Sequence, residues 1–160
     1  MHEFLTADLC DDFSDNIAVA QPLFKSYGLQ PRFCGPAYTL KVFEDNALVR
    51  STLEQDGKGQ VLVIDGGGSI RCALVGGNLG VLACDNNWSG IVVNGCIRDS
   101  VEINQQSIGV KALGTHPLKS IKKGVGDINI AVRFADVTFT PGHWVYSDED
   151  GIVVSPKKLL

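Results

Sequence analysis

A strand buried on both faces is predicted by Gly90-Ile91-Val92-Val93-Asn94-Gly95, a continuous and largely apolar run. The run leads directly into Arg98-Asp99, so a charged pair follows the end of the strand. A second run of the same kind covers residues 60–65 and ends at Gly66-Gly67-Gly68. Because such strands lie in parallel sheets covered by helices, the chain predicts an α/β fold with a site where loops leave the strand ends.

Three helices and one further strand are predicted around these two runs. Ser, Thr, Asp and Asn side chains accept hydrogen bonds from the free N–H groups that begin a helix. The three predicted N-caps and helices are Thr6 before residues 7–13, Asp45 before residues 46–55, and Asn78 before residues 79–83. The stretch up to Gly35-Pro36 predicts no regular structure, and the alternation over residues 37–43 predicts a strand.

The last third of the chain predicts an antiparallel portion. Short apolar runs cover residues 137–140, 144–146 and 152–154, and tight turns at Pro141-Gly142 and Asp150-Gly151 separate them. The prediction is therefore a mixed α/β fold with a barrel-like β core.

Size and charge limit the class of protein. The chain has 160 residues, which predicts a single domain over residues 1–160 with one core. With 44% hydrophobic residues and a net charge of −4, it lacks the basic surface that a nucleic-acid backbone requires. Direct binding of nucleic acid is not expected.

A cytoplasmic location is predicted from two absences in the sequence. The N-terminus lacks the basic and apolar regions of a signal peptide, and no stretch approaches the roughly 18 apolar residues of a membrane span, so no membrane association is expected. The five cysteines are odd in number and form no C-x-x-C pair, which favours small buried side chains over disulfides or a zinc site. Cys96, close to Arg98, is a weaker candidate for a catalytic thiol.

Two glycine-rich loops are candidates for anion binding. Gly66-x-Gly68 is followed at the third dinucleotide fingerprint position by Arg71, where close helix packing requires Gly or Ala, so a dinucleotide site is rejected. Gly76-Gly77-Asn78-Leu79 begins a predicted helix, whose free N–H groups favour a carboxylate. The alternative is that these glycines serve only a tight turn.

Arg98 and Asp99 add the side chains that a backbone loop cannot supply. The planar guanidinium of Arg98 can bind a carboxylate or a developing enolate through two hydrogen bonds. Asp99 is able to hold a hard divalent cation such as Mg²⁺, which commonly uses one or two carboxylates and keeps several waters. The alternative is a surface ion pair in which Asp99 or Ser100 caps a helix.

Taken together, three motifs resemble the regulator of ribonuclease activity A family, which also contains metal-dependent 4-hydroxy-4-methyl-2-oxoglutarate (HMG) aldolases. They are Gly76-Gly77-Asn78-Leu79, the segment from Gly90 to Asp99, and Pro141-Gly142 with Asp148-x-Asp150-Gly151-Ile152-Val153-Val154. The resemblance covers nearly the whole chain. It implies a swivelling β/β/α-type domain that assembles as a homotrimer with active sites between subunits.

The same resemblance implies roles for the motif residues. Arg98 binds pyruvate, Asp99 holds Mg²⁺ or Mn²⁺, and the amides from Gly76 to Leu79 grip the substrate carboxylate. Many aldolase members carry an acidic residue where this chain has Gly77. A second family pattern has glycine there and an acid three residues after the Asp, and Glu102 satisfies it. Glu102 would orient a water or act as the base.

Three functions follow as expectations. The leading one is a divalent-metal lyase that cleaves HMG to two pyruvates and decarboxylates oxaloacetate, because both reactions leave a pyruvate enolate. A Schiff-base mechanism would instead need a desolvated lysine, for which the candidates are Lys111, Lys119, Lys122 and Lys123. The rival from another class is a protein-binding regulator that inhibits the endoribonuclease RNase E without catalysis.

Overall fold

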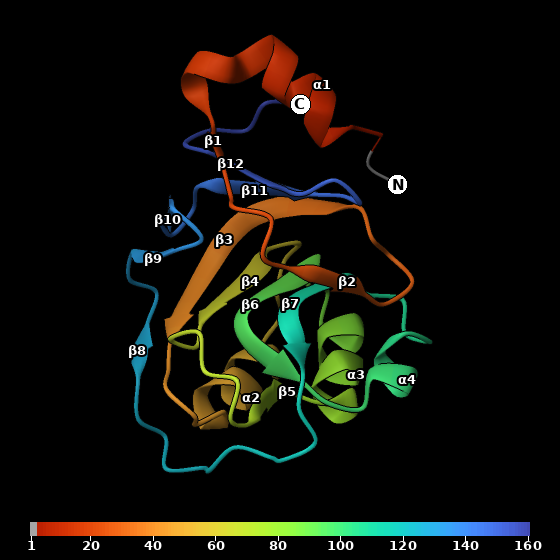
Figure 1. Cartoon of the computed structure of the whole chain (residues 1–160), viewed down its shortest axis with the longest axis vertical. Coiled ribbons are helices and arrows are strands. Elements are labelled where there is room, and N and C mark those ends of the chain that lie inside the picture. The colour runs from red at the N-terminus through yellow and green to blue at the C-terminus, as the bar shows by residue number, and fades with distance from the viewer. Residues whose placement is uncertain (1–2) are drawn as a thin grey trace.

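A curled mixed sheet forms the centre of the computed structural model, which describes residues 3–160 (Figure 1). Four neighbouring strands in its middle are parallel: β3 (Phe33–Lys41), β4 (Val61–Asp65), β6 (Gly90–Ile97) and β7 (Val110–Thr115). The short strand β5 (Ala73–Val75) also runs parallel to β6. The sheet curls into a half-barrel, which confirms the predicted mixed α/β fold with a barrel-like core.

The two apolar runs form β4 and β6, and both strands are buried on both faces as predicted. Leu62 and Ile64 of β4 pack on the helical side of the sheet, whereas Val61 and Val63 pack into a second core on the other side. All four side chains are fully buried. Alternate residues of one strand therefore join two cores, which explains why the run has no polar face.

Three helices cover one face of the parallel strands. They are α2 (Ala47–Leu53), α3 (Gly77–Asp85) and α4 (Ser100–Ile103), and Figure 1 shows them gathered at the lower end of the molecule. Helix α2 follows β3, and α3 and α4 follow β5 and β6. All three helices thus begin beyond the carboxyl ends of parallel strands, where an α/β fold places its ligand site.

Antiparallel strands complete the sheet on both flanks. The last third of the sequence predicts the two at residues 144–147 and 152–155, whereas those at residues 18–19 and 25–27 show that the prediction of no regular structure before Gly35-Pro36 is wrong. On one flank are β11 (Trp144–Ser147), β12 (Ile152–Ser155) and β1 (Ala18–Val19); β2 (Lys25–Tyr27) pairs with β7 on the other, and β8 (Asp127–Ile128) pairs with β3. A separate hairpin of β9 (Val132–Phe134) and β10 (Val137–Phe139) covers the second core. No helix among residues 3–160 combines the length and apolar character needed to cross a membrane.

Strand β3 begins earlier than predicted. It runs from Phe33 to Lys41, so Gly35-Pro36 lies inside the strand and does not precede it. The first half pairs antiparallel with β11 and the second half pairs parallel with β4. The missing N–H of Pro36 falls close to where the strand changes partner. A strand that changes its neighbouring strand shows no change of pattern in the sequence. The predicted start of β3 at residue 37 is therefore wrong.

Helix α1 (Thr6–Phe13) is capped by a residue from the far end of the chain. Thr6 is the first helical residue, and its N–H and hydroxyl donate to the two carboxylate oxygens of Asp148, at 2.6 and 2.7 Å. The prediction that Thr6 itself is the N-cap is therefore wrong. The prediction for α2 is closer: the helix starts at Ala47, whose N–H donates to Asp45 at 3.0 Å, although Asn46 occupies the N-cap position.

Candidate functional site

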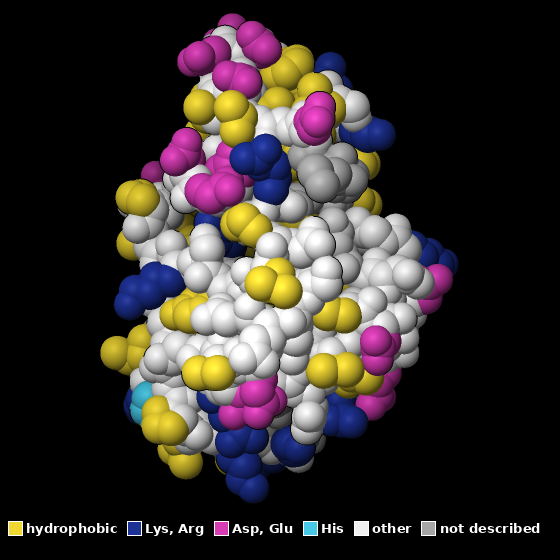
Figure 2. All heavy atoms as spheres, turned by 90° about the vertical axis from the view of Figure 1, so that its right-hand side faces the viewer, with side chains coloured by type: hydrophobic (Ala, Val, Ile, Leu, Met, Phe, Trp, Pro, Cys, Tyr) yellow, Lys and Arg dark blue, Asp and Glu magenta, His cyan; other side chains and the backbone are white. Residues whose placement is uncertain are grey.

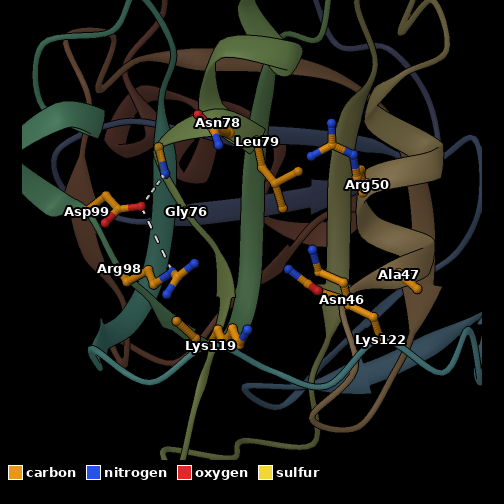
Figure 3. A pocket seen from close by; sticks show the side chains of 12 residues that line it. Asn46, Ala47, Arg50, Gly76, Asn78, Leu79, Arg98, Asp99, Lys119 and Lys122 are labelled. Atoms are coloured by element: carbon orange, nitrogen blue, oxygen red, sulfur yellow. Dashed lines mark hydrogen bonds and ion pairs between the residues drawn. The ribbon is translucent and has the colours of Figure 1, made fainter.

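A pocket of about 100 Å³ opens at the carboxyl ends of β5 and β6 (Figure 3). One wall comes from the turn into α3 and from the residues that follow β6. The opposite wall comes from the start of α2 and from an irregular segment after β7. The lining residues are Asn46, Ala47, Arg50, Ala73, Gly76, Gly77, Asn78, Leu79, Arg98, Asp99, Lys119 and Lys122. The structure thus brings the loop Gly76–Leu79 together with Arg98 and Asp99, as the sequence predicts.

Helix α3 begins one residue earlier than its predicted cap. Its first residue is Gly77 and its N-cap is Gly76, so Asn78 lies inside the first turn and does not cap it. The acceptor comes from elsewhere: the Gly77 N–H donates to Asp99 Oδ2 at 3.0 Å. Because a distant carboxylate fulfils the capping role, the helix requires no capping side chain of its own.

This turn has few free amides. The Leu79 and Gly80 N–H groups donate to the Gly76 carbonyl at 3.1 Å, and Asp99 already occupies the Gly77 N–H. A substrate carboxylate would therefore bind the Asn78 N–H or take the place of Asp99 at Gly77. Close approach is possible because neither Gly76 nor Gly77 carries a side chain.

Arg98 points its guanidinium along the pocket wall (Figure 3). Its backbone N–H donates to the Val75 carbonyl at 2.9 Å, which continues the pairing of β5 with β6. Its Nε lies 4.0 Å from Asp99 Oδ2, at the outer limit of an ion pair, and the side chain is 41% exposed. A loose, half-exposed pair of this kind contributes little stability. The fork of Arg98 is accordingly available to a ligand.

Asp99 lies in the left-handed backbone region, with φ of 55° and ψ of 41°, directly before the short helix α4. This conformation is uncommon for a residue with a side chain, although Asp and Asn adopt it more readily than most. Asp99 stands at the N-cap position of α4, but its side chain does not bond to that helix and turns to Gly77 instead. The strained turn therefore places the carboxylate at the pocket.

Glu102 lies beside the glycine turn but is not among the residues that line the pocket. It lies in α4, and its Oε2 atom occupies the space that a β-carbon on Gly77 would need, closer than the 3.0 Å that real β-carbons keep. A β-carbon on Gly76 would in turn lie 3.0 Å from Asp99 Oδ2. Two carboxylates thus approach two adjacent glycines, in a space that any side chain there would fill.

This pair of carboxylates fits a divalent cation of the Mg²⁺ type. Such cations need only one or two carboxylates and complete their shell with water and substrate oxygens. Among residues 3–160, no group of three or more His, Cys, Asp or Glu is placed to hold a metal ion. A cation at this place would therefore rest on Asp99 and depend on water and ligand oxygens for the rest of its shell.

The opposite wall is cationic, and the sequence reasoning missed it. Arg50 extends from α2, and Lys119 and Lys122 come from residues 116–126, which form no helix and no regular strand. Figure 3 shows Arg50 and Lys122 across the pocket from Asp99 and Lys119 below Arg98, and Figure 2 shows Lys and Arg side chains gathered at the lower end of the molecule. The two lysines were candidates only for a Schiff base. A charged segment without periodicity gives no signal of where it folds.

Asn46 contributes an unused acceptor to the same wall. Its Nδ2 donates to the Leu74 carbonyl at 3.2 Å, and its buried Oδ1 has no partner among the described residues. A buried polar atom without a partner costs stability, unless a ligand or water supplies the missing bond. Asn46 is thus suited to accept a hydrogen bond from a hydroxyl group of a ligand.

The loop Gly66–Gly68 is a closed turn and not a phosphate site. The Gly67 N–H donates to Asp65, the Gly68 N–H to the Asn94 carbonyl and the Ser69 N–H to the Gly66 carbonyl. These three N–H groups already donate hydrogen bonds within the protein and are not free to bind a phosphate. This geometry agrees with the rejection of a dinucleotide site.

The remaining nucleophile candidates lie outside the pocket or are unsuited to the role. All five cysteines are free, and burial raises the pKa of the Cys96 thiol, which disfavours the reactive thiolate. Lys111 is buried, and its Nζ donates to Ser26 and to the Asp148 carbonyl. It pairs in register with Val92, well before the strand ends that carry Arg98.

The fold and the pocket together define a class of protein: an α/β domain that offers a guanidinium, two carboxylates and a cationic wall to a small organic anion at its strand ends. Within that class, the chain belongs to the RraA-like family, because the family model described as Aldolase/RraA matches residues 6–154. The resemblance seen in the sequence is confirmed.

Similar proteins cover the full length of the chain. A relative from Aromatoleum aromaticum is 60% identical over 158 residues and one from Laribacter hongkongensis is 58% identical over 158 residues, each with 99% of both chains covered. Both carry the name "Putative 4-hydroxy-4-methyl-2-oxoglutarate aldolase". These names support the aldolase branch of the family.

Two solved structures share the fold closely. One, from Geobacillus kaustophilus, is described as an S-adenosylmethionine: 2-dimethylmenaquinone methyltransferase; it is 49% identical, with a TM-score of 0.96 and coverage of 98% of this chain and 97% of that chain. The other is the RNA-processing inhibitor RraA from Thermus thermophilis, 43% identical, with a TM-score of 0.95 and coverage of 99% and 96%. The names differ in activity, so the shared fold does not select one.

Proposed function

We propose that the protein is a divalent-metal-dependent lyase that cleaves HMG to two pyruvates and decarboxylates oxaloacetate. The observation that carries the proposal is the convergence of Arg98, Asp99 and Glu102 on the glycine turn at Gly77. This cluster combines a guanidinium group that can bind a 2-oxo acid with carboxylates that can serve a cation. The names of the relatives support the same reaction.

Both substrates are dicarboxylates, which suits the two walls of the pocket. Arg98 and the turn Gly76–Leu79 would bind the 2-oxo acid end that becomes pyruvate enolate. Arg50, Lys119 and Lys122 would bind the second carboxylate. The free Oδ1 of Asn46 would accept a hydrogen bond from the hydroxyl of HMG.

Asp99 would hold the Mg²⁺ or Mn²⁺ ion, and Glu102, beside the pocket, would orient water or act as the base. When bound, the ion supplies Lewis-acid polarisation of the 2-oxo group. Asp99 is already at the pocket and 42% exposed, so it can turn from Gly77 to a cation. In the proposed site it keeps one oxygen for the ion and releases the Gly77 N–H to the substrate carboxylate.

The chain's own groups would handle charge and protons. In HMG the bond between C3 and C4 breaks, the C4 hydroxyl loses its proton to a base, and the electron pair remains on the pyruvate fragment as an enolate. Glu102 would be that base, directly or through a water. Arg98 would offset the developing enolate charge, and a proton returned to C3 gives the second pyruvate. In oxaloacetate CO₂ leaves and no base is required.

Turnover of oxaloacetate tests the proposal. The wild-type protein with Mg²⁺ or Mn²⁺ should consume oxaloacetate well above the rate of metal alone, and Arg98→Ala and Asp99→Ala should fall to that background. HMG cleavage, followed as pyruvate release, should respond in the same way. A wild-type rate equal to the metal-only rate would contradict the proposal.

A second candidate function is inhibition of RNase E through the protein surface. The observation in its favour is the 43% identity to the RNA-processing inhibitor RraA over nearly the whole chain. Because this role needs no pocket chemistry, Asp99→Ala should leave it intact. A pull-down with purified RNase E and an RNA cleavage assay would test this role independently of lyase activity.

We also propose a cytoplasmic homotrimer with the pocket between subunits. Apolar side chains on the surface beside the pocket support this assembly: Leu118, Ile121 and Val125 are between 53% and 67% exposed in the single chain. Light scattering should give a mass three times 17.2 kDa. A monomer in dilute buffer would contradict this assembly.

A further inference from the structure

The segment of residues 116–126, here called the strap, carries Lys119 and Lys122 to the pocket without regular structure of its own. In the single chain every residue from 121 to 126 is exposed, so burial within the chain does little to hold the strap. Its shape depends on hydrogen bonds to neighbouring segments. The Ala73 N–H donates to the Leu118 carbonyl at 2.8 Å, and Ile121 exchanges two backbone hydrogen bonds with Glu44 and Asn46.

Asp45 supplies the remaining attachment. Its carboxylate is 2% exposed, and Oδ2 accepts the N–H groups of Lys123 at 3.0 Å and Val125 at 3.1 Å. Its other oxygen accepts the N–H of Ala47, the first residue of α2. One buried side chain therefore joins the strap to the helix that presents Asn46 and Arg50. Both sources of the cationic wall meet at this carboxylate.

We infer that Asp45 is a positioning residue that sets the cationic wall for the second carboxylate of a dicarboxylate ligand. The inference rests on the proposed function for its substrate class. Asp45 does not line the pocket and touches no ligand; it acts through Lys122 and Arg50. Loss of its three hydrogen bonds loosens Lys122 relative to Arg50, while the wall formed by Arg98 and Asp99 is unchanged.

The charge state of Asp45 agrees with this role. Burial alone would raise the pKa of the carboxyl, but hydrogen bonds from Ala47, Val125 and Lys123 outweigh burial, and the pKa lies below its ordinary value. The group is therefore an acceptor at both oxygens. Asparagine cannot replace it, because its NH₂ group donates and so meets at least one of the three N–H groups as a second donor.

Calorimetry with two probes, L-malate and pyruvate, tests the inference apart from turnover. L-malate carries two carboxylates on the carbon chain of oxaloacetate, and pyruvate carries one. Asp45→Asn should weaken L-malate binding about tenfold, the effect of one charge-assisted contact, and change pyruvate binding by less than about twofold. Asp56→Asn is the matched control, because the exposed Asp56 also accepts a backbone N–H, from Lys58, but lies outside the pocket.

A second variant covers the case in which Asp45→Asn does not fold. Gly124, between the two N–H donors, has φ of 79° and open space around it, so Gly124→Ala strains this turn without a steric clash. Gly124→Ala should weaken the binding of L-malate but not that of pyruvate, and the effect should be smaller than in Asp45→Asn. Gly142→Ala, with φ of 83° and open space in another turn, is its control.

The outcomes separate the two proposals. Equal L-malate affinity in Asp45→Asn, Gly124→Ala and the wild type overturns the inference, and so does equal weakening of both probes. A wild type that binds L-malate and responds to Asp45→Asn but does not turn over oxaloacetate supports the inference and overturns the lyase. If the wild type binds neither probe, the inference is wrong, and the turnover of oxaloacetate alone decides the lyase.

Discussion

The Oε2 atom of Glu102 fills the space that the missing side chain of Gly77 leaves at the start of helix α3. Family members that carry an acid at the position of Gly77 would bring a carboxylate to this region from α3. Here the carboxylate comes from α4. A side chain at position 77 would displace Glu102 from its present place, so the two arrangements are alternatives.

Gly77→Ala should separate stability from activity. The atom in the way is the end of a flexible side chain, so Glu102 can swing aside and the free energy of unfolding should change by less than about 1 kcal/mol. Metal-dependent turnover should fall as far as it does in Glu102→Gln, because both variants remove the Glu102 carboxylate from its place beside the glycine turn. Urea denaturation and oxaloacetate kinetics measure the two effects. Gly151→Ala, in open space, is the control, and full activity in Gly77→Ala would show that Glu102 has no role.

Asp99→Asn should isolate charge from backbone geometry. Asparagine tolerates φ of 55° and can still accept the Gly77 N–H, so the fold should be retained. Turnover should nevertheless fall at least a hundredfold, since the variant lacks the negative charge that holds a divalent cation. Asp99→Ala adds strain at the same position and should be less stable than Asp99→Asn. Near-normal activity of Asp99→Asn at low Mg²⁺ would refute the metal role.

Chelation and borohydride should give opposite results for the two chemistries. Lys119 and Lys122 are exposed and therefore not desolvated as a Schiff-base lysine must be, and the buried Lys111 lies away from the pocket. EDTA should abolish turnover, and added Mn²⁺ should restore it. Borohydride with pyruvate should leave the mass of the protein unchanged. A reduced pyruvate adduct on any lysine, with activity that survives EDTA, would establish the Schiff-base route.

Asp148 should make stability depend on acid pH. Burial opposes ionisation, but the hydrogen bonds from Thr6, Asp150 and Gly151 outweigh it and lower the pKa of the carboxyl. A lowered folded-state pKa adds stability that is complete above the unfolded value of about 4 and lost as pH falls through the folded value. Asp148→Asn should lower the free energy of unfolding by about 2 kcal/mol at pH 7. Below about pH 4 the difference in stability between this variant and the wild type should become smaller.

Denaturation curves between neutral and acid pH measure this effect. Asp12→Asn, an exposed carboxylate on the same helix, should follow the wild-type curve throughout. A constant difference between Asp148→Asn and wild type at every pH would mean that the hydrogen bonds stabilise the protein without favouring the charged form.

Local patterns predicted the centre of the fold and half of the pocket. The strands β4 and β6 are recognisable because burial on both faces leaves a uniform apolar run. Arg98 and Asp99 are recognisable because they follow such a run. The helix starts were less predictable, since Asp99 and Asp148 cap α3 and α1 from distant positions in the chain. No window of neighbouring residues contains such a contact.

The cationic wall was not predictable for a related reason. Lys119 and Lys122 lie on a strap without a hydrophobic pattern, and the part of the strap next to Lys122 is attached to Asp45, more than 70 residues earlier. The glycine at position 77 could be noticed in the sequence, but the steric exchange with Glu102 required coordinates. Functional residues that directly follow a strand were thus easier to predict in this chain than those on an irregular segment.

The change of partner in β3 has a consequence for the order of folding. Residues 37–41 can pair with β4 soon after they are synthesised, but residues 33–36 must wait for β11 at residues 144–147. Helix α1 must wait as well, because its cap is Asp148. A ribosome-bound chain can therefore form the parallel layer that bears Arg98 while helix α1 and residues 33–36 still lack their partners, and the barrel closes only when synthesis is nearly complete.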